Sequence, residues 1–341
     1  MIRYFIQKIG KNKMKVKKFS AIPHGACSFY RSSPILKLQK LDSSIYGSTF
    51  GEKIEWNYLV DTDCVFFERP ESADITQAIK KIKAMNIPIW SDYDDDMFNI
   101  PDDNPSHEHY SKKEIRESII QCISLSDVVT VTTESLRQKF LNYNENVYVI
   151  PNAFNDYNYK LNKNVSDEMI INWRGSNTHR RDILSCSWSM IRINREYPKW
   201  MWTFIGKELE FITDRLNNIK CIGELPVSKY WEFVSNISIA IQIVPLQFNT
   251  FNMSKSNISW IEGVYTGACC LAPNMPEWNK PGILTYNNEE EFYWHLRQLI
   301  IDEDLRRENF ELSKAYIKQN LMLSEVNKKR FEILDFLVNN R

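Results

Sequence analysis

A lysine and a glutamate seven residues apart have types and a spacing that could serve nucleotide binding. Lys255 and Glu262 lie in residues 251–267, which we predict contain a helix with its N-cap at Ser254 and a terminating glycine at Gly267. One helix would place them nearly on a line, with backbones about 10 Å apart. An ammonium group beside free N–H groups suits a phosphate, and a carboxylate two turns later suits a sugar hydroxyl pair. The alternative is a solvated lysine and glutamate beside a core helix.

The sequence around this helix predicts an open parallel sheet with a second basic loop. Apolar runs at residues 237–246 and 268–272 predict buried strands on either side of the helix. Another strand is predicted at 169–173. A loop follows it and leads into a helix, with candidate phosphate-binding residues Arg174, Gly175, Ser176, His179 and Arg180. Backbone N–H groups and cations together can hold phosphate in such a loop. An ordinary surface loop with arginines is the alternative.

The segment around Lys255 resembles the sugar-donor segment of retaining glycosyltransferases with two Rossmann-like domains, the group-one family of the GT-B fold. Many of those enzymes carry Phe-Asn-x-x-Lys-Ser, followed after five residues by Glu. Asn252, Lys255, Ser256 and Glu262 match that pattern. Many relatives also have a first glutamate eight positions before the second, where this chain has Ser254. The resemblance therefore implies nucleotide-sugar binding by the four matching residues, without the first carboxylate.

The resemblance extends over nearly the whole chain after residue 15 and implies an α/β fold of two Rossmann-like domains facing a cleft, with C-terminal helices. It is strongest at residues 127–152, 171–182 and 245–272. The implied division is an acceptor-side domain at 1–154, a linker at 155–167, a sugar-donor domain at 168–312 and a C-terminal helix at 313–341. In the family this last helix often crosses back to the first domain.

Local patterns predict several individual elements. Residues 1–18 are basic and read as a frayed arm, or as an arm that contacts an acidic surface. Strands are predicted at 18–22, 58–60, 64–67, 87–90, 128–132, 146–153, 202–206 and 219–223. Helices are predicted at 76–85, 111–124, 226–235, 289–301 and 305–339. Thr133 is predicted to cap a helix with Glu134 in its first turn.

Candidate acceptor residues follow the first and fourth predicted strands of the N-terminal half. They are Gly25, Arg31, Asp92, Asp94 and Asp95. Loops at the carboxyl ends of parallel strands are where ligands bind in open α/β sheets, and the family has an acidic loop at the second of these places. The segment Asp92-Tyr93-Asp94 also matches the Asp-x-Asp that holds Mn²⁺ or Mg²⁺ in glycosyltransferases of the other main fold, GT-A. That interpretation leaves Lys255 and Glu262 unexplained. The segment 107–109 (His-Glu-His) is interpreted as a solvated loop rather than a metal site.

Composition restricts the compartment and the partners. The 341 residues carry 43 basic and 43 acidic side chains, so nothing indicates a uniformly basic nucleic-acid binder, although a local patch would be compatible. No apolar run reaches the length of a membrane span. Seven cysteines without Cys-x-x-Cys spacing fit buried thiols in a reducing cytosol, so we expect a cytoplasmic protein. Neither composition nor motifs indicate an oligomeric state.

The resemblance implies transfer of a hexose from a nucleoside diphosphate sugar to a hydroxyl, with retention and without a metal or other cofactor. The acceptor would be a glycan, a lipid-linked molecule or another hydroxyl compound. Arg174 or Arg180, together with Lys255, would stabilise the leaving diphosphate, and Glu262 would orient the ribose. Three alternatives remain: a viral-type glycosyltransferase acting on hydroxymethylpyrimidine bases in DNA, a metal-dependent transferase using residues 92–96, and a non-catalytic nucleotide-binding module.

Overall fold

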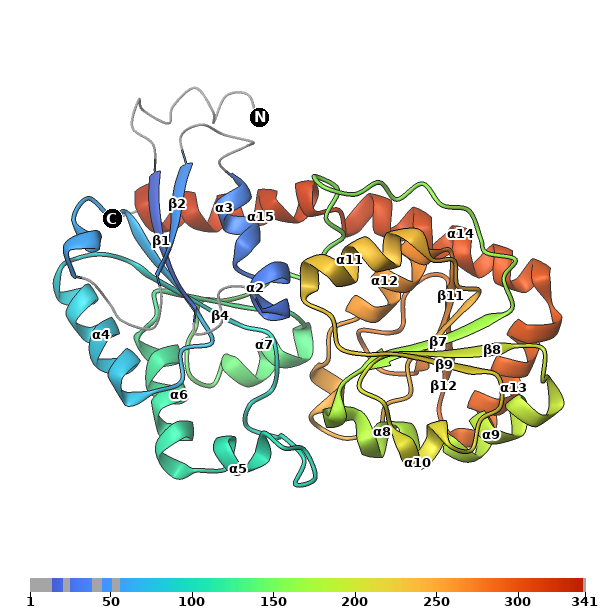
Figure 1. Cartoon of the computed structure of the whole chain (residues 1–341). Helices are drawn as coiled ribbons and strands as arrows, with labels where there is room; N and C mark the ends of the chain where they lie inside the picture. Colours follow the sequence, from blue (N-terminus) through green and yellow to red (C-terminus); the bar gives the residue numbers. More distant parts are fainter. Residues whose placement is uncertain (1–13, 21–24, 39–44, 51–55, 340–341) are drawn as a thin grey trace. The chain divides into compact units, whose positions relative to one another are not determined.

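Two separate parallel sheets organise the chain (Figure 1). The computed structural model describes residues 14–20, 25–38, 45–50 and 56–339. By contacts the chain divides into two compact units. Unit 1 comprises residues 1–94, 112–150 and 325–341, and unit 2 comprises 95–111 and 151–324. The expectation of two α/β units, each with its own parallel sheet, is confirmed.

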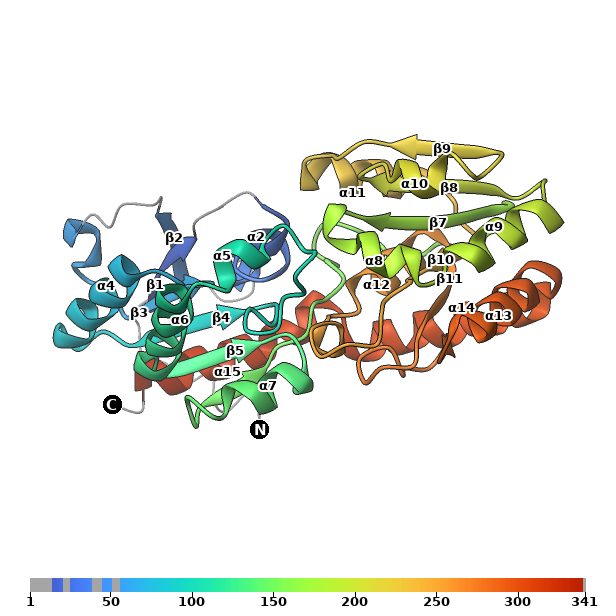
Figure 2. The same cartoon turned by 90° about the horizontal axis from the view of Figure 1, so that it is seen from below.

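The described part of the unit 1 sheet has six strands in the order β2-β1-β3-β4-β5-β6, all parallel. The strands are β1 (Met14–Ser20), β2 (Ile45–Phe50), β3 (Cys64–Glu68), β4 (Ile89–Tyr93), β5 (Val128–Val131) and β6 (Val147–Val149). Helices α4 (Ala73–Ala84) and α6 (Lys113–Leu125) pack side by side (Figure 2). Their apolar stripes close a core over Val65, Phe67 and Ile89, because each helix turns one face to the sheet. The other helical segments are α2 (Ala26–Tyr30), α3 (Ser33–Lys37), η2 (Trp56–Leu59) and α7 (Glu134–Phe140).

The unit 2 sheet also has six strands, in the order β12-β11-β10-β7-β8-β9. They are β7 (Ile170–Gly175), β8 (Met201–Gly206), β9 (Ile219–Ile222), β10 (Ile241–Ile243), β11 (Cys269–Pro273) and β12 (Ile283–Tyr286). Figure 1 shows α11 (Val227–Asn236) and α12 (Ile258–Thr266) above this sheet. Below it lie α8 (Arg180–Leu184), α9 (Ser187–Glu196) and α10 (Glu210–Thr213). The unit also contains the short segments η3 (Asn177–His179), η4 (Asn252–Ser254) and α5 (His107–Tyr110).

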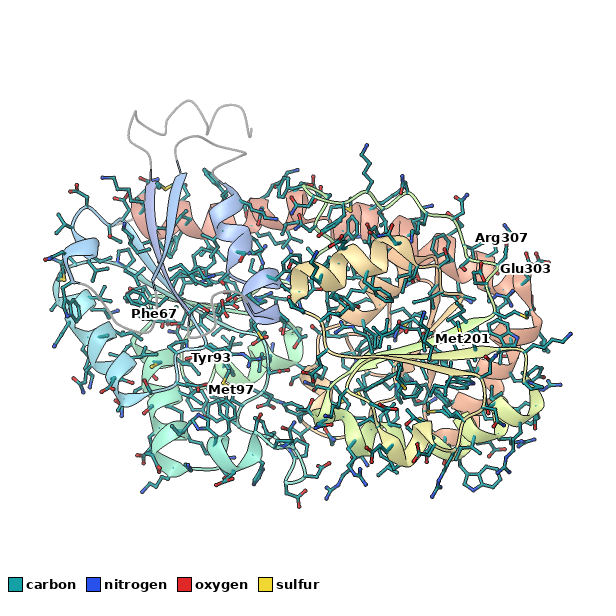
Figure 3. All side chains as sticks on the ribbon, viewed as in Figure 1. Phe67, Tyr93, Met97, Met201, Glu303 and Arg307 are labelled. Atoms are coloured by element: carbon teal, nitrogen blue, oxygen red, sulfur yellow. The ribbon has the colours of Figure 1, made fainter. Side chains whose placement is uncertain are left out.

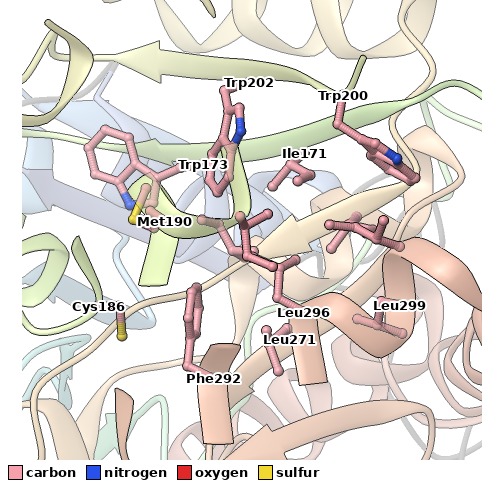
Figure 4. Packing of buried hydrophobic residues seen from close by; sticks show 14 of the residues in the cluster. Ile171, Trp173, Cys186, Met190, Trp200, Trp202, Leu271, Phe292, Leu296 and Leu299 are labelled. Carbon is pink, nitrogen blue, oxygen red and sulfur yellow. The ribbon is translucent and has the colours of Figure 1, made fainter. Parts of the chain in front are cut away.

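Large aromatic side chains fill the interior of unit 2. Trp173 and Trp202, on the neighbouring strands β7 and β8, meet Phe292 and Leu296 of α13 (Glu289–Ile301) (Figure 4). Strands with helices on both faces must be apolar on both sides, and tryptophans such as Trp173, Trp200 and Trp202 supply much of that buried volume. This packing fixes the strand ends from which the candidate site loops emerge.

Two helices end the chain, and the break between them has a local cause. Helix α14 (Glu303–Asn320) is followed by α15 (Leu323–Asn339), where one continuous helix was predicted. The backbone N–H of Phe154 donates to the Leu321 carbonyl, and the Leu323 N–H donates to the Phe154 carbonyl, both over 2.8 Å. Residues 321–323 therefore bond to Phe154 instead of continuing the helix. On α14 the exposed pair Glu303–Arg307 lies at the rim of unit 2 (Figure 3).

Several local predictions are confirmed and others are wrong. Thr133 caps α7 by accepting from the Leu136 N–H, and helix 289–301 has the predicted bounds. The predicted strand at 58–60 falls on the 3₁₀ turn η2, and the predicted loop at 107–109 forms the short helix α5. Most of the basic arm lies outside the described residues, but its last part forms β1. There Lys18 is buried 4.0 Å from Glu68, and burial lowers the pKa of Lys18.

No helix among the described residues is both long and apolar enough to cross a membrane. All seven cysteines lie in described ranges and none is in a disulfide. Burial raises the pKa of Cys122 to about 11 and that of Cys186 to about 12, so both thiols stay protonated at neutral pH. The cytoplasmic location stays a prediction.

A glycine at the end of β8 allows this strand to lie close to the end of β7. Gly206 has φ +112°, and a Cβ there would lie 2.1 Å from the carbonyl oxygen of Gly175 on β7. Gly206→Ala is expected to lower the free energy of unfolding by about 1–3 kcal/mol, as measured by urea unfolding. Gly223→Ala, just after β9, is the control because a Cβ there meets nothing within 4 Å. Equal stability of the two variants would contradict this account.

Candidate functional site

The two loops predicted to bind the sugar donor leave the unit 2 sheet at the same edge. Strands β7 and β10 are parallel neighbours, with Ile171 opposite Ile241. The predicted residues 174–180 run from the end of β7 through η3 to the start of α8, and the loop after β10 runs through η4 to α12. The carboxyl edge of a parallel sheet is where ligands bind in α/β folds. The structure therefore brings both predicted segments to one place.

The start of α12 differs from the prediction, and so does the position of Lys255. Residues 252–254 form the separate turn η4, in which the Lys255 N–H donates to the Asn252 carbonyl. Lys255 itself is extended, and α12 begins at Ile258 with Asn257 as its N-cap. Lys255 and Glu262 therefore do not lie along one helix, and the predicted cap at Ser254 was wrong. The terminating glycine is confirmed, since Gly267 has φ +96°.

The buried Glu262 side chain contacts two residues from neighbouring elements. Its side chain is 2% exposed and its Oε2 pairs with Arg174 Nε at the end of β7. Tyr230, in the first turn of α11, donates its hydroxyl to the same oxygen over 2.8 Å. Burial, and next the Glu262 carboxylate, raise the pKa of Tyr230 well above its usual value, so the hydroxyl keeps its proton. Tyr230 was not predicted from the sequence, because it lies 32 residues from Glu262.

Lys255 is held by contacts within unit 2. Its Nζ lies 3.2 Å from Asp95 Oδ1 and 4.3 Å from the centre of the Phe251 ring. Both charged groups are partly exposed, at 18% and 29% of their side-chain surface. Asp95, predicted as an acceptor residue, therefore belongs to unit 2 and contacts a predicted sugar-donor residue. A diphosphate bound at Lys255 would compete with this carboxylate for the ammonium group.

The loop after β7 places its polar residues in different environments. His179 Nδ1 lies 2.8 Å from Asp182 Oδ2, and Ser176 caps η3 by accepting from the Thr178 N–H. Arg180 is exposed and stacks on Phe211, with 4.6 Å between its Cζ and the ring centre. Gly175 has no room for a side chain, because a Cβ would meet the Trp173 ring at 2.5 Å. Of the two candidate arginines, only Arg174 contacts Glu262.

The two remaining predicted sugar-donor residues are held by side-chain hydrogen bonds. Asn252 is 2% exposed and donates from Nδ2 to Asp182 over 2.8 Å. Ser256 Oγ accepts from Asn152 Nδ2 over 2.9 Å. Asn152 comes from the Ile-Pro-Asn end of the first half of the sequence and belongs to unit 2. Asp182 was also missed by sequence analysis, although an acidic side chain three residues after His179 on a short helix was a usable signal.

The predicted acceptor residues of unit 1 are largely buried. Arg31 (1% exposed) donates to both oxygens of Asp92 (3% exposed), over 2.9 and 2.6 Å. Arg31 also donates to the Ile150 carbonyl, and Thr130 donates to Asp92. Gly25 precedes α2 with an extended backbone. In this conformation Arg31 and Asp92 tie β4 to the end of α2, and their role toward an acceptor stays a prediction.

The two carboxylates of the Asp92-Tyr93-Asp94 segment pair with different arginines. Asp92 pairs with Arg31, whereas Asp94 pairs with Arg69. Among the described residues no group of three or more His, Cys, Asp and Glu side chains is arranged to hold a metal ion. His107 Nδ1 lies 2.7 Å from the Ile100 carbonyl oxygen. The arginine pairing gives both carboxylates a role other than metal ligation.

Glu262→Gln is expected to raise KM for the sugar donor about 10-fold with little change in kcat. The substitution removes a charge that contacts Arg174, and we expect the same carboxylate to contact the ribose equally in ground and transition states. Initial rates at varied donor concentration measure both constants. Glu311→Gln, at an exposed position of α14, is the control. A fall in kcat at unchanged KM would instead mean that Glu262 acts through Arg174 in the transition state.

Comparison with known proteins identifies the fold. No protein-family model and no curated protein matches the sequence. Among solved structures, a glycosyltransferase from Rickettsia africae is 14% identical with a TM-score of 0.65, and the alignment covers 97% of this chain and 100% of that one. HepE from Anabaena, solved with UDP and glucose, is 12% identical with a TM-score of 0.65, over 94% and 99% of the two chains.

A third similar structure is an alpha-glucosyltransferase solved with UDP and a 13-mer DNA containing an HMU base. It is 13% identical with a TM-score of 0.64, over 95% of this chain and 100% of that one. Together with the two parallel six-stranded sheets, these similarities show that the chain has the GT-B fold. One fold can carry different reactions, so the activity must be argued from the site.

Proposed function

We propose that the protein transfers a hexose from a UDP-sugar to an acceptor hydroxyl, with retention. The observation that carries this proposal is the set of side chains at the carboxyl edge of β7 and β10. Arg174 and Lys255 supply cations, and Glu262 supplies a buried carboxylate beside Arg174. UDP is the proposed nucleotide because two structures of the same fold were solved with it.

The chemistry requires charge stabilisation where the sugar–phosphate bond breaks. The leaving UDP gains negative charge on its terminal phosphate, and preorganised cations stabilise that charge in the transition state. Lys255 is held between Asp95 and Phe251, and Arg174 is held by Glu262, so neither side chain must be ordered at the moment of reaction. We therefore propose that protein cations act on the diphosphate, and that turnover continues without a divalent metal.

A thermal-shift screen of nucleotide sugars, followed by a UDP-release assay, tests the proposal. We expect UDP and at least one UDP-sugar to raise the melting temperature, and that sugar donor to be hydrolysed or transferred. Stabilisation without any turnover over a panel of acceptors would indicate a nucleotide-binding module. If no nucleotide sugar stabilised the protein, the proposal would be wrong.

The acceptor panel should include duplex DNA containing hydroxymethyluracil. The DNA-bound relative has nearly the same TM-score as the other two, so the fold alone does not favour one acceptor class. The zero net charge argues mildly against DNA. Tight duplex binding that weakens steeply with salt would identify phosphate contacts and make DNA the leading acceptor.

A further inference from the structure

The side chain of Asp182 joins the two loops that our proposed function assigns to the diphosphate. Asp182 lies on α8 and is 6% exposed. Its Oδ2 lies 2.8 Å from His179 Nδ1 in the loop after β7. Its Oδ1 accepts from the Gln247 backbone N–H over 2.9 Å and from Asn252 Nδ2 over 2.8 Å, both in the loop after β10. Helices α8 and α12 lie on opposite faces of the sheet (Figure 1), and this carboxylate joins α8 to the loop that leads into α12.

The Asp182 carboxylate also orients the side chains it holds, because an ionised carboxylate only accepts hydrogen bonds and each partner must turn a donor toward it. His179 must therefore present a protonated Nδ1, which fixes how the ring is turned and leaves Nε2 on the far side. Asn252 must present its NH₂ group, whose other contact is to the Gln247 carbonyl over 3.0 Å. Both contacts of Asn252 Nδ2 are thus accounted for, and the amide cannot flip without breaking them.

The fixed amide leaves one polar atom with no partner. Asn252 Oδ1 is buried and has no hydrogen-bond partner among the described residues. Buried acceptors without partners are rare in folded proteins, because each loses its hydration. An oxygen that can only accept, in the same loop as Lys255, suits a hydroxyl or amide N–H of the sugar donor.

We propose that Asp182 is a positioning residue, which turns His179 and Asn252 toward the UDP-sugar and couples the two loops that bind it. This inference rests on the proposed function. It assigns Asp182 no contact with substrate, and its effect passes through the two side chains it holds. The two loops should then bind UDP as one unit rather than as independent contributors.

A double-mutant cycle on UDP affinity, measured by isothermal titration calorimetry, tests the coupling. Asp182→Asn keeps one oxygen for the loop after β10 but turns an NH₂ group toward His179, so UDP affinity should fall about 10- to 100-fold. His179→Ala should cost about as much. The double variant should bind no more weakly than the weaker single variant, because both changes break the same link. Asp214→Asn, at an exposed position of the same unit, is the matched control and should change affinity less than twofold.

If the losses of affinity multiply in this cycle, Asp182 and His179 affect UDP binding independently, and the inference is overturned. An unchanged affinity of Asp182→Asn would also overturn it. If Asp182→Asn lacks a cooperative thermal transition, the cycle is run with His179→Ala and Asn252→Ala, which leaves Asp182 in place. If the two loops are coupled, the losses of UDP affinity in these two variants are again non-additive in free energy. Additive losses would contradict the inference. Failure of the wild-type protein to bind UDP would instead remove the proposed function, and this inference with it.

Discussion

Replacing Lys255 with alanine is expected to lower kcat for transfer from a UDP-sugar by about 10²- to 10³-fold. The Lys255 ammonium group lies at the edge where β7 and β10 end, and it is positioned by Asp95 at 3.2 Å and by the Phe251 ring. Removal of a preorganised charge acts mainly on the transition state, in which the leaving diphosphate carries the most charge. Steady-state rates at saturating donor measure the loss.

The control for this variant is Lys318→Ala, because Lys318 is an exposed lysine of α14 in the same unit. It should leave kcat unchanged. If Lys255→Ala raised KM while kcat stayed the same, Lys255 would bind donor and transition state equally, and its proposed role in leaving-group stabilisation would be wrong.

Arg31→Met is expected to lower the free energy of unfolding by about 3–5 kcal/mol, because it leaves the buried Asp92 carboxylate without its cation. Arg31 is 1% exposed and bonds both oxygens of Asp92 as well as the Ile150 carbonyl. Urea unfolding followed by circular dichroism measures the change. The double variant Arg31→Met/Asp92→Asn should recover part of the loss, since no buried charge then remains unpaired.

Lys83→Met is the comparison variant for stability. It breaks the ion pair between Lys83 and Asp127 in the same unit, and both of these side chains are about a third exposed. Such pairs contribute about 0–1 kcal/mol. Should Arg31→Met leave stability unchanged and alter only the KM for an acceptor, the sequence-based assignment of Arg31 to the acceptor would be favoured over the structural role described above.

The sequence was sufficient to predict the elements that follow from the spacing of apolar residues and from residues that end helices. Apolar runs predicted most strands of both sheets, and Gly267 ends α12 because only a residue tolerant of positive φ fits there. The assignment of the two sugar-donor loops to one diphosphate came from the family resemblance, and the structure supplies the reason they meet, since β7 and β10 are neighbouring parallel strands. Strands β2 and β12 were missed; β2 in particular contains a glycine, a serine and a threonine that weaken the apolar pattern.

What could not be predicted depends on contacts between distant residues. Both Ser254 and Asn257 are good N-cap residues, and only the 3₁₀ turn at 252–254 decides in favour of Asn257. Asp182 lies 70 residues from Asn252, so nothing local indicates that they bond. Lys18 reads as part of a charged arm, yet strand pairing buries it near Glu68.

The central claim, that protein cations rather than a metal stabilise a leaving UDP, is tested most directly by UDP release. The rate is measured for the wild-type protein and for Lys255→Ala, each with and without EDTA. We predict that wild-type turnover survives EDTA and that Lys255→Ala is slower by about 10²- to 10³-fold in both conditions. EDTA-sensitive turnover together with an active Lys255→Ala protein would contradict the account and direct attention to Asp92 and Asp94.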